Sequence, residues 1–201
     1  MRAFVAMLLL AGAGAGAAAP LIETSTTPPA GTPLATIDPD SRFEFALFTR
    51  WGQEFTGRFP QVQGDIVALP DGRRQVRITL PTADVEIIDH PRYTRFARGP
   101  RFFDVARFPD VQFVSEPYTM QLLTDGGVLA GRLRMHGVQR RERFTFEPGT
   151  CERPGRGCDI VARGTVQRAN YDIDGWSMAL RDEVRFTMRV RLRDVAASGG
   201  Q

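Results

Sequence analysis

The sequence contains no lysine, and it contains only two histidines and two cysteines. All 26 residues counted as lysine or arginine are therefore arginine, which genomic composition explains as easily as function does. The chain has no zinc-ligand spacing, no nucleophile elbow and no phosphate-binding loop. His90 and His136 stand far apart in the sequence and form no catalytic pattern. We therefore expect that the protein is not an enzyme and holds no metal.

Long hydrophobic segments are also missing. The apolar run from Ala3 to Ala11 is too short to span a bilayer. It follows one charged residue, Arg2, and leads into alanine-rich sequence that ends at Ala19, which is typical of a secretory signal. We predict a signal peptide at residues 1–19 and export of the protein. A flexible linker rich in Thr, Pro and Ser is predicted at 20–35, and a tail at 196–201.

The sequence also lacks a strong excess of positive charge. The formal net charge is only +3, and acidic residues are interspersed among the arginines. A protein that binds nucleic acid usually concentrates basic side chains on one patch. Together with export, this balance leads us to expect no nucleic-acid partner.

The two cysteines lie close together in the sequence. Cys151 and Cys158 enclose a turn-rich segment that contains Pro154, Gly155 and Gly157. In an oxidising compartment we expect a disulfide across this loop. The alternative is a metal or redox pair, which would need closer spacing or further ligands.

What the chain does contain is one strand pattern after another. In the last of them Val184, Phe186, Met188, Val190 and Leu192 alternate with polar residues that are mostly arginine. About eight such strands joined by short turns predict an all-β fold, an antiparallel sheet closed into a barrel.

Residues 89–98 interrupt this alternation. We expect a short helix there, with Asp89 as its cap and Pro91 in its first turn.

An aromatic segment precedes the central strand. Residues Phe102 to Pro109 form a compact turn that ends at a proline, and the strand Val111 to Ser115 follows with Phe113 on its inner face. This layout predicts an aromatic plug that partly closes one end of the barrel.

The segment from Arg101 to Pro117 resembles the central signature of the YceI-like family, the bacterial polyisoprenoid-binding proteins. It contains Phe-Phe-Asp, then Phe-Pro three residues later, then Val-x-Phe-x-Ser. The resemblance extends over about residues 36–195, with two departures: Asp40 stands where the family usually has a histidine, and Asp172 to Gly175 alters an acidic-glycine ending. Further segments agree in order: Ile37–Phe45, Gly57–Phe59, Gly131–Val138, Gln167–Tyr171 and Asp182–Phe186.

The resemblance implies a lipocalin-like barrel at 36–195 that lies in the periplasm and holds a long isoprenoid chain. Such a protein would transport, store or protect a quinone or polyprenyl lipid and would need no other cofactor. The alternative is a barrel filled by its own side chains, which acts through its surface as an envelope stress-related structural protein. The residues predicted to face the lumen are Phe43, Phe45, Phe59, Ile78, Phe103, Phe113, Leu133, Met135, Phe144, Phe146, Phe186 and Met188.

Three residues are predicted to meet the lipid headgroup at the barrel mouth: Arg168, Tyr171 and Trp176. Trp51, like Trp176, lies in a predicted loop and either packs over a barrel end or lines the mouth. The arginines of the last strand form either a solvated outer face or a surface for transient contact with an anionic membrane.

Overall fold

The computed structural model describes residues 31–195. The predicted signal peptide, most of the predicted linker and the predicted tail lie outside the described residues. Strand β1 begins at Thr32, within the segment predicted as a linker.

Within residues 31–195, twelve strands form a single sheet in which the pairings between strands are antiparallel. Their order is β12-β1-β4-β5-β7-β8-β9-β10-β11-β2-β3-β6. In chain order the strands are β1 (Thr32–Ile37), β2 (Arg42–Thr49), β3 (Glu54–Phe59), β4 (Gln63–Ala68), β5 (Arg74–Pro81), β6 (Glu86–Ile87), β7 (Asp110–Ser115), β8 (Gly127–Met135), β9 (Val138–Phe146), β10 (Ile160–Gln167), β11 (Leu180–Val190) and β12 (Leu192–Asp194).

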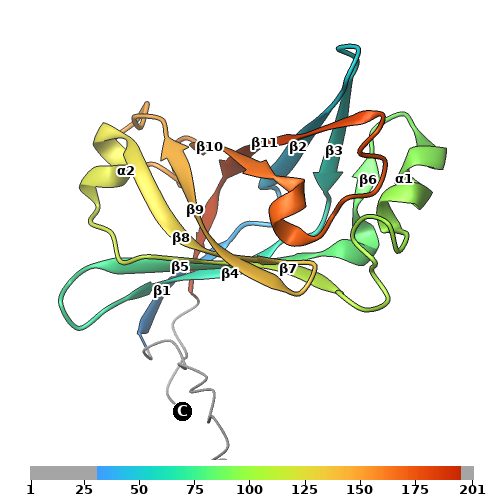
Figure 1. Cartoon of the computed structure of the whole chain (residues 1–201). Helices are drawn as coiled ribbons and strands as arrows, with labels where there is room; N and C mark the ends of the chain where they lie inside the picture. The colour runs from blue at the N-terminus through green and yellow to red at the C-terminus, as the bar shows by residue number, and fades with distance from the viewer. Residues whose placement is uncertain (1–30, 196–201) are drawn as a thin grey trace, which may run out of the picture.

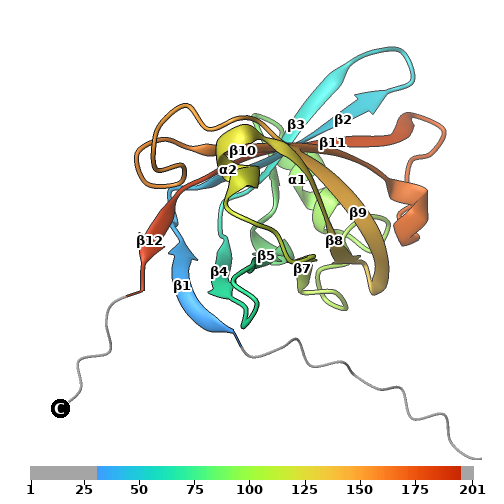
Figure 2. The same cartoon turned by 90° about the vertical axis from the view of Figure 1, so that its left-hand side faces the viewer.

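The sheet curls round on itself into a barrel-like shape (Figures 1 and 2). β2 pairs with β11 on one side and β3 on the other, while β1 pairs with β12 and β4. β1 leads directly into β2, and β11 into β12, so the paired segments β1 with β12 and β2 with β11 connect distant parts of the strand order and close the curl of the sheet. The prediction of an all-β antiparallel fold is therefore confirmed.

The predicted number of eight strands was wrong, because several expected strands are broken by bends. β3 and β4 are separated by a bend around Pro60, whose ring removes a backbone donor. The last strand is divided at Arg191. Its N–H donates to the Ser41 hydroxyl at 3.0 Å, and its carbonyl accepts from the Asp38 N–H at 2.9 Å, so it bonds to the bend between β1 and β2.

Phenylalanine rings fill the middle of the barrel. The Phe45 ring lies 5.6 Å from Phe59 and 6.1 Å from both Phe103 and Phe186, measured between ring centroids. A Cβ atom at Gly57 would lie 2.2 Å from Phe45 Cζ, so the chain needs a glycine there to admit the ring. This packing gives the barrel a tightly filled centre.

Two α-helices lie at opposite ends of the barrel (Figure 1). α1 (Pro91–Arg98) occupies the predicted place, but its cap is His90 rather than Asp89. The sequence interpretation did not include α2 (Gln121–Asp125). We call the α1 end the mouth and the α2 end the sealed end. Short 3-10 helices also form, η1 (Thr82–Asp84) and η2 (Arg168–Tyr171).

The aromatic segment packs partly inside the barrel. Phe102 and Phe103 are buried, whereas Phe108 stacks on His136 with ring centroids 4.4 Å apart. The chain turn is held by backbone bonds, including one from the Phe103 N–H to the Ala97 carbonyl at 3.0 Å. That the segment acts as a plug stays a prediction.

A second apolar cluster and the disulfide close the sealed end. Leu123 of α2 packs there with Tyr118, Leu129 and Ile160. The predicted disulfide between Cys151 and Cys158 is present, with Cα atoms 6.0 Å apart. In residues 31–195, no helix has both the length and the apolar character required to cross a bilayer.

Candidate functional site

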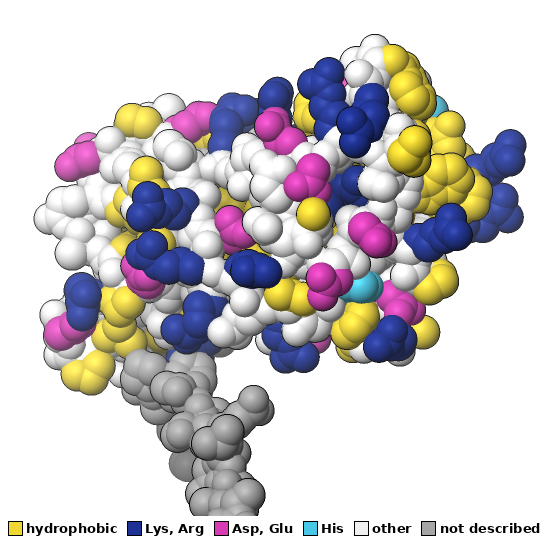
Figure 3. All heavy atoms as spheres, in the orientation of Figure 1, with side chains coloured by type: hydrophobic (Ala, Val, Ile, Leu, Met, Phe, Trp, Pro, Cys, Tyr) yellow, Lys and Arg dark blue, Asp and Glu magenta, His cyan; other side chains and the backbone are white. Residues whose placement is uncertain are grey.

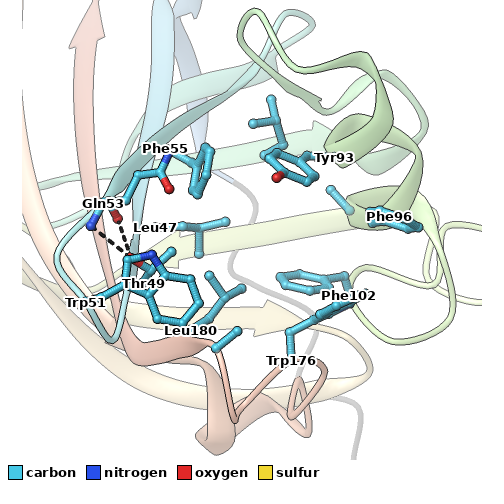
Figure 4. A pocket seen from close by; sticks show the side chains of 13 residues that line it. Leu47, Thr49, Trp51, Gln53, Phe55, Tyr93, Phe96, Phe102, Trp176 and Leu180 are labelled. Carbon is cyan, nitrogen blue, oxygen red and sulfur yellow. Dashed lines mark hydrogen bonds between the residues drawn. The ribbon is translucent and has the colours of Figure 1, made fainter.

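A cavity of about 280 Å³ opens at the mouth of the barrel. Its walls come from the β2–β3 hairpin, from α1, from the aromatic segment and from the chain leading into β11 (Figure 4). The lining residues are Leu47, Thr49, Trp51, Gln53, Phe55, Ile87, Tyr93, Phe96, Ala97, Phe102, Trp176, Ala179 and Leu180. We call this space the mouth cavity.

Aromatic rings make up much of its wall. Phe55 and Tyr93 meet edge to face with centroids 5.0 Å apart, and Phe96 lies 5.5 Å from Trp176. Tyr93 and Phe96 are three residues apart on α1, so both rings lie on the same side of the helix. The contact between Phe96 and Trp176 joins α1 to the loop before β11 across the opening.

Polar groups are few in this cavity. The Thr49 hydroxyl accepts a hydrogen bond from the Gln53 N–H at 2.8 Å and donates to the Gln53 carbonyl at 3.3 Å, so it is satisfied within the hairpin (Figure 4). No charged side chain is among the described residues that line the cavity. An apolar ligand with a small polar group suits such a wall, whereas an isolated charge would be poorly solvated there.

Two smaller apolar cavities continue the series into the barrel. The central cavity measures about 20 Å³ and shares Leu47, Ala97 and Phe102 with the mouth cavity. The inner cavity measures about 80 Å³ and shares Phe186 with the central one. The three spaces therefore follow one another through shared walls, with the phenylalanine rings of the barrel centre between them.

The predicted lumen residues all lie on the inside of the barrel, but they line the smaller cavities rather than the mouth. Phe45, Phe103 and Met135 line the central cavity, Phe186 borders both, and Phe59 lines none of the three. The inner cavity is bordered by the others: Phe43, Ile78, Phe113, Leu133, Phe144, Phe146 and Met188. Their role in lipid binding stays a prediction.

Arg168 is buried at the wall of the central cavity. Its guanidinium donates to the carbonyls of Gly175 at 2.9 Å and Ile173 at 3.3 Å, and it lies over the Phe102 ring. Burial lowers the pKa of Arg168, while the nearby carboxylate of Asp182 opposes that shift. Arg168 thus holds the loop that carries Trp176, and the structure places it behind the mouth rather than at its opening.

Tyr171 is not at the mouth. Its side chain is fully buried, and it lines none of the three cavities. The hydroxyl donates to Glu142 on β9 at 2.8 Å; burial and this hydrogen bond raise the pKa of Tyr171. β9 and β10 pair with each other only near Phe146 and Ala162. Beyond that point, the hydrogen bond from Tyr171 in η2, which follows β10, to Glu142 on β9 connects the two strands. Of the three predicted mouth residues, only Trp176 lines the mouth cavity.

Several mouth residues were missed from the sequence. Phe55, Tyr93, Phe96 and Phe102 were not among the predicted site residues, and Trp51 was considered only as a loop residue with two interpretations. The usable signal was the i, i+3 spacing of Tyr93 and Phe96 in a short helix that also carries arginines. Nothing in the local sequence indicates that this helix lies beside the β2–β3 hairpin.

The part of the chain from 31 to 195 brings together no group of three or more histidine, cysteine, aspartate or glutamate side chains that could hold a metal ion. The family profile of the YceI-like domain matches residues 36–192. The chain belongs to the YceI-like family.

Solved structures share the fold of this YceI-like protein. A polyisoprenoid binding domain from Saccharophagus degradans, implicated in plant cell wall breakdown, superposes with a TM-score of 0.61 at 12% identity. The match covers 81% of this chain and 99% of that domain. BcnA of Burkholderia cenocepacia gives 0.61 at 14% identity, covering 78% of this chain and 99% of that one.

A YceI protein from Campylobacter jejuni gives a TM-score of 0.57 at 17% identity, covering 70% of this chain and 85% of that one. At such identities these likenesses show the fold alone. No curated protein matches this YceI-like sequence.

Proposed function

We propose that this protein binds an isoprenoid lipid, with an end of the lipid in the mouth cavity, and carries or shields it after export to the periplasm. The observation on which this rests is the mouth cavity itself, with about 280 Å³ of space and no charged wall residue among those described. Membership of the YceI-like family supports the proposal, as does the fold shared with a domain named for polyisoprenoid binding.

Cavity size limits how much of the lipid fits. Small-molecule sites usually measure roughly 300–1,000 Å³, so the mouth cavity lies near the lower limit. It suits a quinone-sized ring or a short isoprenoid segment. A long chain would need the Phe45, Phe103 and Phe186 rings to move, so that the central and inner cavities join the mouth. Each buried methylene contributes about 0.8 kcal/mol, so apolar contact alone supplies the affinity and no catalytic group is needed.

The close packing of the barrel centre favours a second candidate, a structural envelope protein without cargo. The central cavity measures only about 20 Å³, and the rings of Phe45, Phe59 and Phe103 fill the space around it. In that case the mouth cavity would be a surface hollow, and changes to its wall would affect neither lipid content nor affinity.

Direct lipid analysis separates the two candidates. Protein purified from a bacterial envelope is extracted with organic solvent, and the extract is analysed by mass spectrometry. Farnesol is then titrated into delipidated protein, with tryptophan fluorescence as the readout, because Trp51 and Trp176 both line the mouth cavity.

A matched pair of variants locates the site. Ala179→Phe adds a ring to the wall of the mouth cavity at a half-buried position. Val128→Phe adds the same ring at an exposed position of β8 that lines none of the three cavities. We expect at least a tenfold loss of farnesol affinity in the first variant and none in the second. Lipid-free protein together with equal affinities in the two variants would contradict the proposal.

A further inference from the structure

Exposed apolar side chains gather around the mouth. Among the described residues, the large hydrophobic side chains with the greatest exposure include Met178 at 89% and Trp51 at 70%. Trp176, Tyr93 and Phe96 are also exposed, at 47%, 44% and 44%. We call these five residues the mouth rim. Four of them line the mouth cavity, and Met178 lies in the chain between Trp176 and Ala179, which both line it. The five therefore form one patch rather than scattered single residues.

Arginines stand beside this rim. Arg92 and Arg95 on α1, and Arg101 just after it, are exposed, and within residues 31–195 none of them forms an ion pair. Figure 3 shows hydrophobic side chains next to arginines at the end that carries α1. Arg50, in the hairpin turn, donates to the Ser177 carbonyl at 2.9 Å.

Acidic side chains are present in the same segments. Glu54 begins β3, Asp89 precedes α1, and Asp174 lies in the loop, where its charge acts on the buried Arg168. Within residues 31–195, none of these acids forms an ion pair with Arg92 or Arg95. The arginines of α1 are therefore the charges best placed to meet an anionic surface in front of the mouth.

The arginines of the last strands offer a contrast. Arg185 pairs with Glu183 at 2.7 Å, Arg191 with Asp159 at 2.7 Å, and Arg193 with Asp38 at 2.6 Å. This stripe was the first candidate for membrane contact from the sequence. Because these charges are largely neutralised by partners on the protein, the stripe attracts an anionic surface less than the unpaired arginines of α1 do.

We infer that the mouth rim docks on the surface of a bilayer that contains anionic lipid. Tryptophan and other aromatic side chains favour the membrane interface, and arginines beside them attract anionic headgroups. Docking in this orientation turns the mouth cavity toward the acyl chains, so a lipid enters or leaves without crossing water. The inference rests on the proposed function for its purpose, but the contact itself can be tested separately.

The chain provides its own probe for docking. Its two tryptophans, Trp51 and Trp176, both belong to the mouth rim, so intrinsic fluorescence reports on this surface alone. Vesicles of phosphatidylcholine are compared with vesicles that also contain phosphatidylglycerol. We expect a blue shift of the emission with the anionic vesicles, quenching by brominated acyl chains, and loss of both effects at high salt.

Variants test the role of the arginines. Arg92→Glu combined with Arg95→Glu reverses two charges that line none of the three cavities. The control, Arg132→Glu with Arg134→Glu, makes the same charge change at exposed positions of β8. We expect partitioning onto anionic vesicles to fall at least tenfold in the first variant and to stay near the original value in the control. Residues 1–30 are identical in all these proteins and contain no tryptophan, so they do not account for a difference.

Three results would overturn the inference. One is an emission spectrum that anionic vesicles leave unchanged, and another is an equal loss of partitioning in the two variants. The third is a blue shift that depends on protein concentration without vesicles, which would identify a second copy as the occupant of the rim. Farnesol affinity in vesicle-free solution is measured in parallel. If farnesol affinity is retained while the protein does not bind vesicles, the docking inference is contradicted and the proposed lipid binding is not.

Discussion

The two ends of the barrel are built from similar residue types but present them differently. At the sealed end, Tyr118 and Leu123 are buried under α2, and the disulfide loop is tied to β12 by a 2.7 Å bond from the Leu192 N–H to the Gly155 carbonyl. At the mouth, Trp51 and Trp176 remain exposed, and a cavity of about 280 Å³ opens between them and α1.

The difference shows that apolar composition alone does not make a binding site. Both ends carry a short helix, yet α2 covers its neighbours while α1 leaves a hollow behind Tyr93 and Phe96. The sealed end also carries the covalent bond, whereas the mouth is held by non-covalent contacts, such as the ring contact between Phe96 and Trp176 and the hydrogen bond from the Arg50 N–H to the Ala179 carbonyl at 2.8 Å. Stability is thus expected to reside in the centre and the sealed end, and binding at the mouth.

The largest effect is expected from Phe45→Ala in the barrel centre. Phe45 is 3% exposed and touches three other phenylalanine rings, so its truncation leaves a cavity. The free energy of unfolding should fall by roughly 3–5 kcal/mol, as measured by chemical denaturation. Phe48→Ala, on the same strand but with its ring under Arg185, should cost clearly less. If long isoprenoids enter the barrel, Phe45→Ala should also bind longer chains than the original protein does.

Raising the pH above about 10 should destabilise the sealed end. Burial raises the pKa of Tyr118 from 10.0 to about 12, and Arg74 opposes this shift. The unfolded state therefore loses this proton first as the pH rises. The stability that depends on the neutral phenol is complete below pH 10 and is lost between about pH 10 and pH 12, which amounts to roughly 3 kcal/mol.

Tyr118→Phe is the control for this titration. It should reduce the fall in unfolding free energy between pH 10 and 12 without removing it, because the pKa of Tyr171 is also raised. An identical alkaline fall in the two proteins would contradict the assignment to Tyr118.

Opening the disulfide should weaken the same end by a similar or smaller amount. Cys151 and Cys158 are seven positions apart, and the entropy of closing so short a loop gives roughly 2–3 kcal/mol. Cys151→Ser with Cys158→Ser should therefore lower the denaturation midpoint, while farnesol affinity stays within about twofold. A large loss of affinity would show that the two ends are coupled and would break the comparison.

The smallest effect on stability is expected at the mouth. Phe96 is 44% exposed, so Phe96→Ala should cost less than about 1 kcal/mol of unfolding free energy. The same change removes part of the cavity wall and the contact with Trp176, so farnesol affinity should fall roughly three- to tenfold. Calorimetry and fluorescence titration on one sample compare the two quantities. A stability loss as large as that of Phe45→Ala would show that the mouth is part of the core.

Much of the fold could be predicted because the periodicity of the strands is local information. The alternation from Val184 to Leu192 indicated which side faces inward, and the predicted lumen residues do lie inside. The strand count could not be predicted, since the break at Arg191 depends on bonds to Ser41 and Asp38, some 150 positions away. The site was predicted less well: Trp176 lines the mouth cavity, while Tyr171 is held inside by Glu142.

The sequence by itself determined the alternating strands, the family signature and the cysteine pair that closes a short loop, because each depends on residues that are near one another in the chain. Only the tertiary structure decided that the open space lies at the mouth rather than in the middle of the barrel. The volume left after packing depends on how rings from distant strands, such as Phe45, Phe103 and Phe186, meet one another, and no local pattern records that.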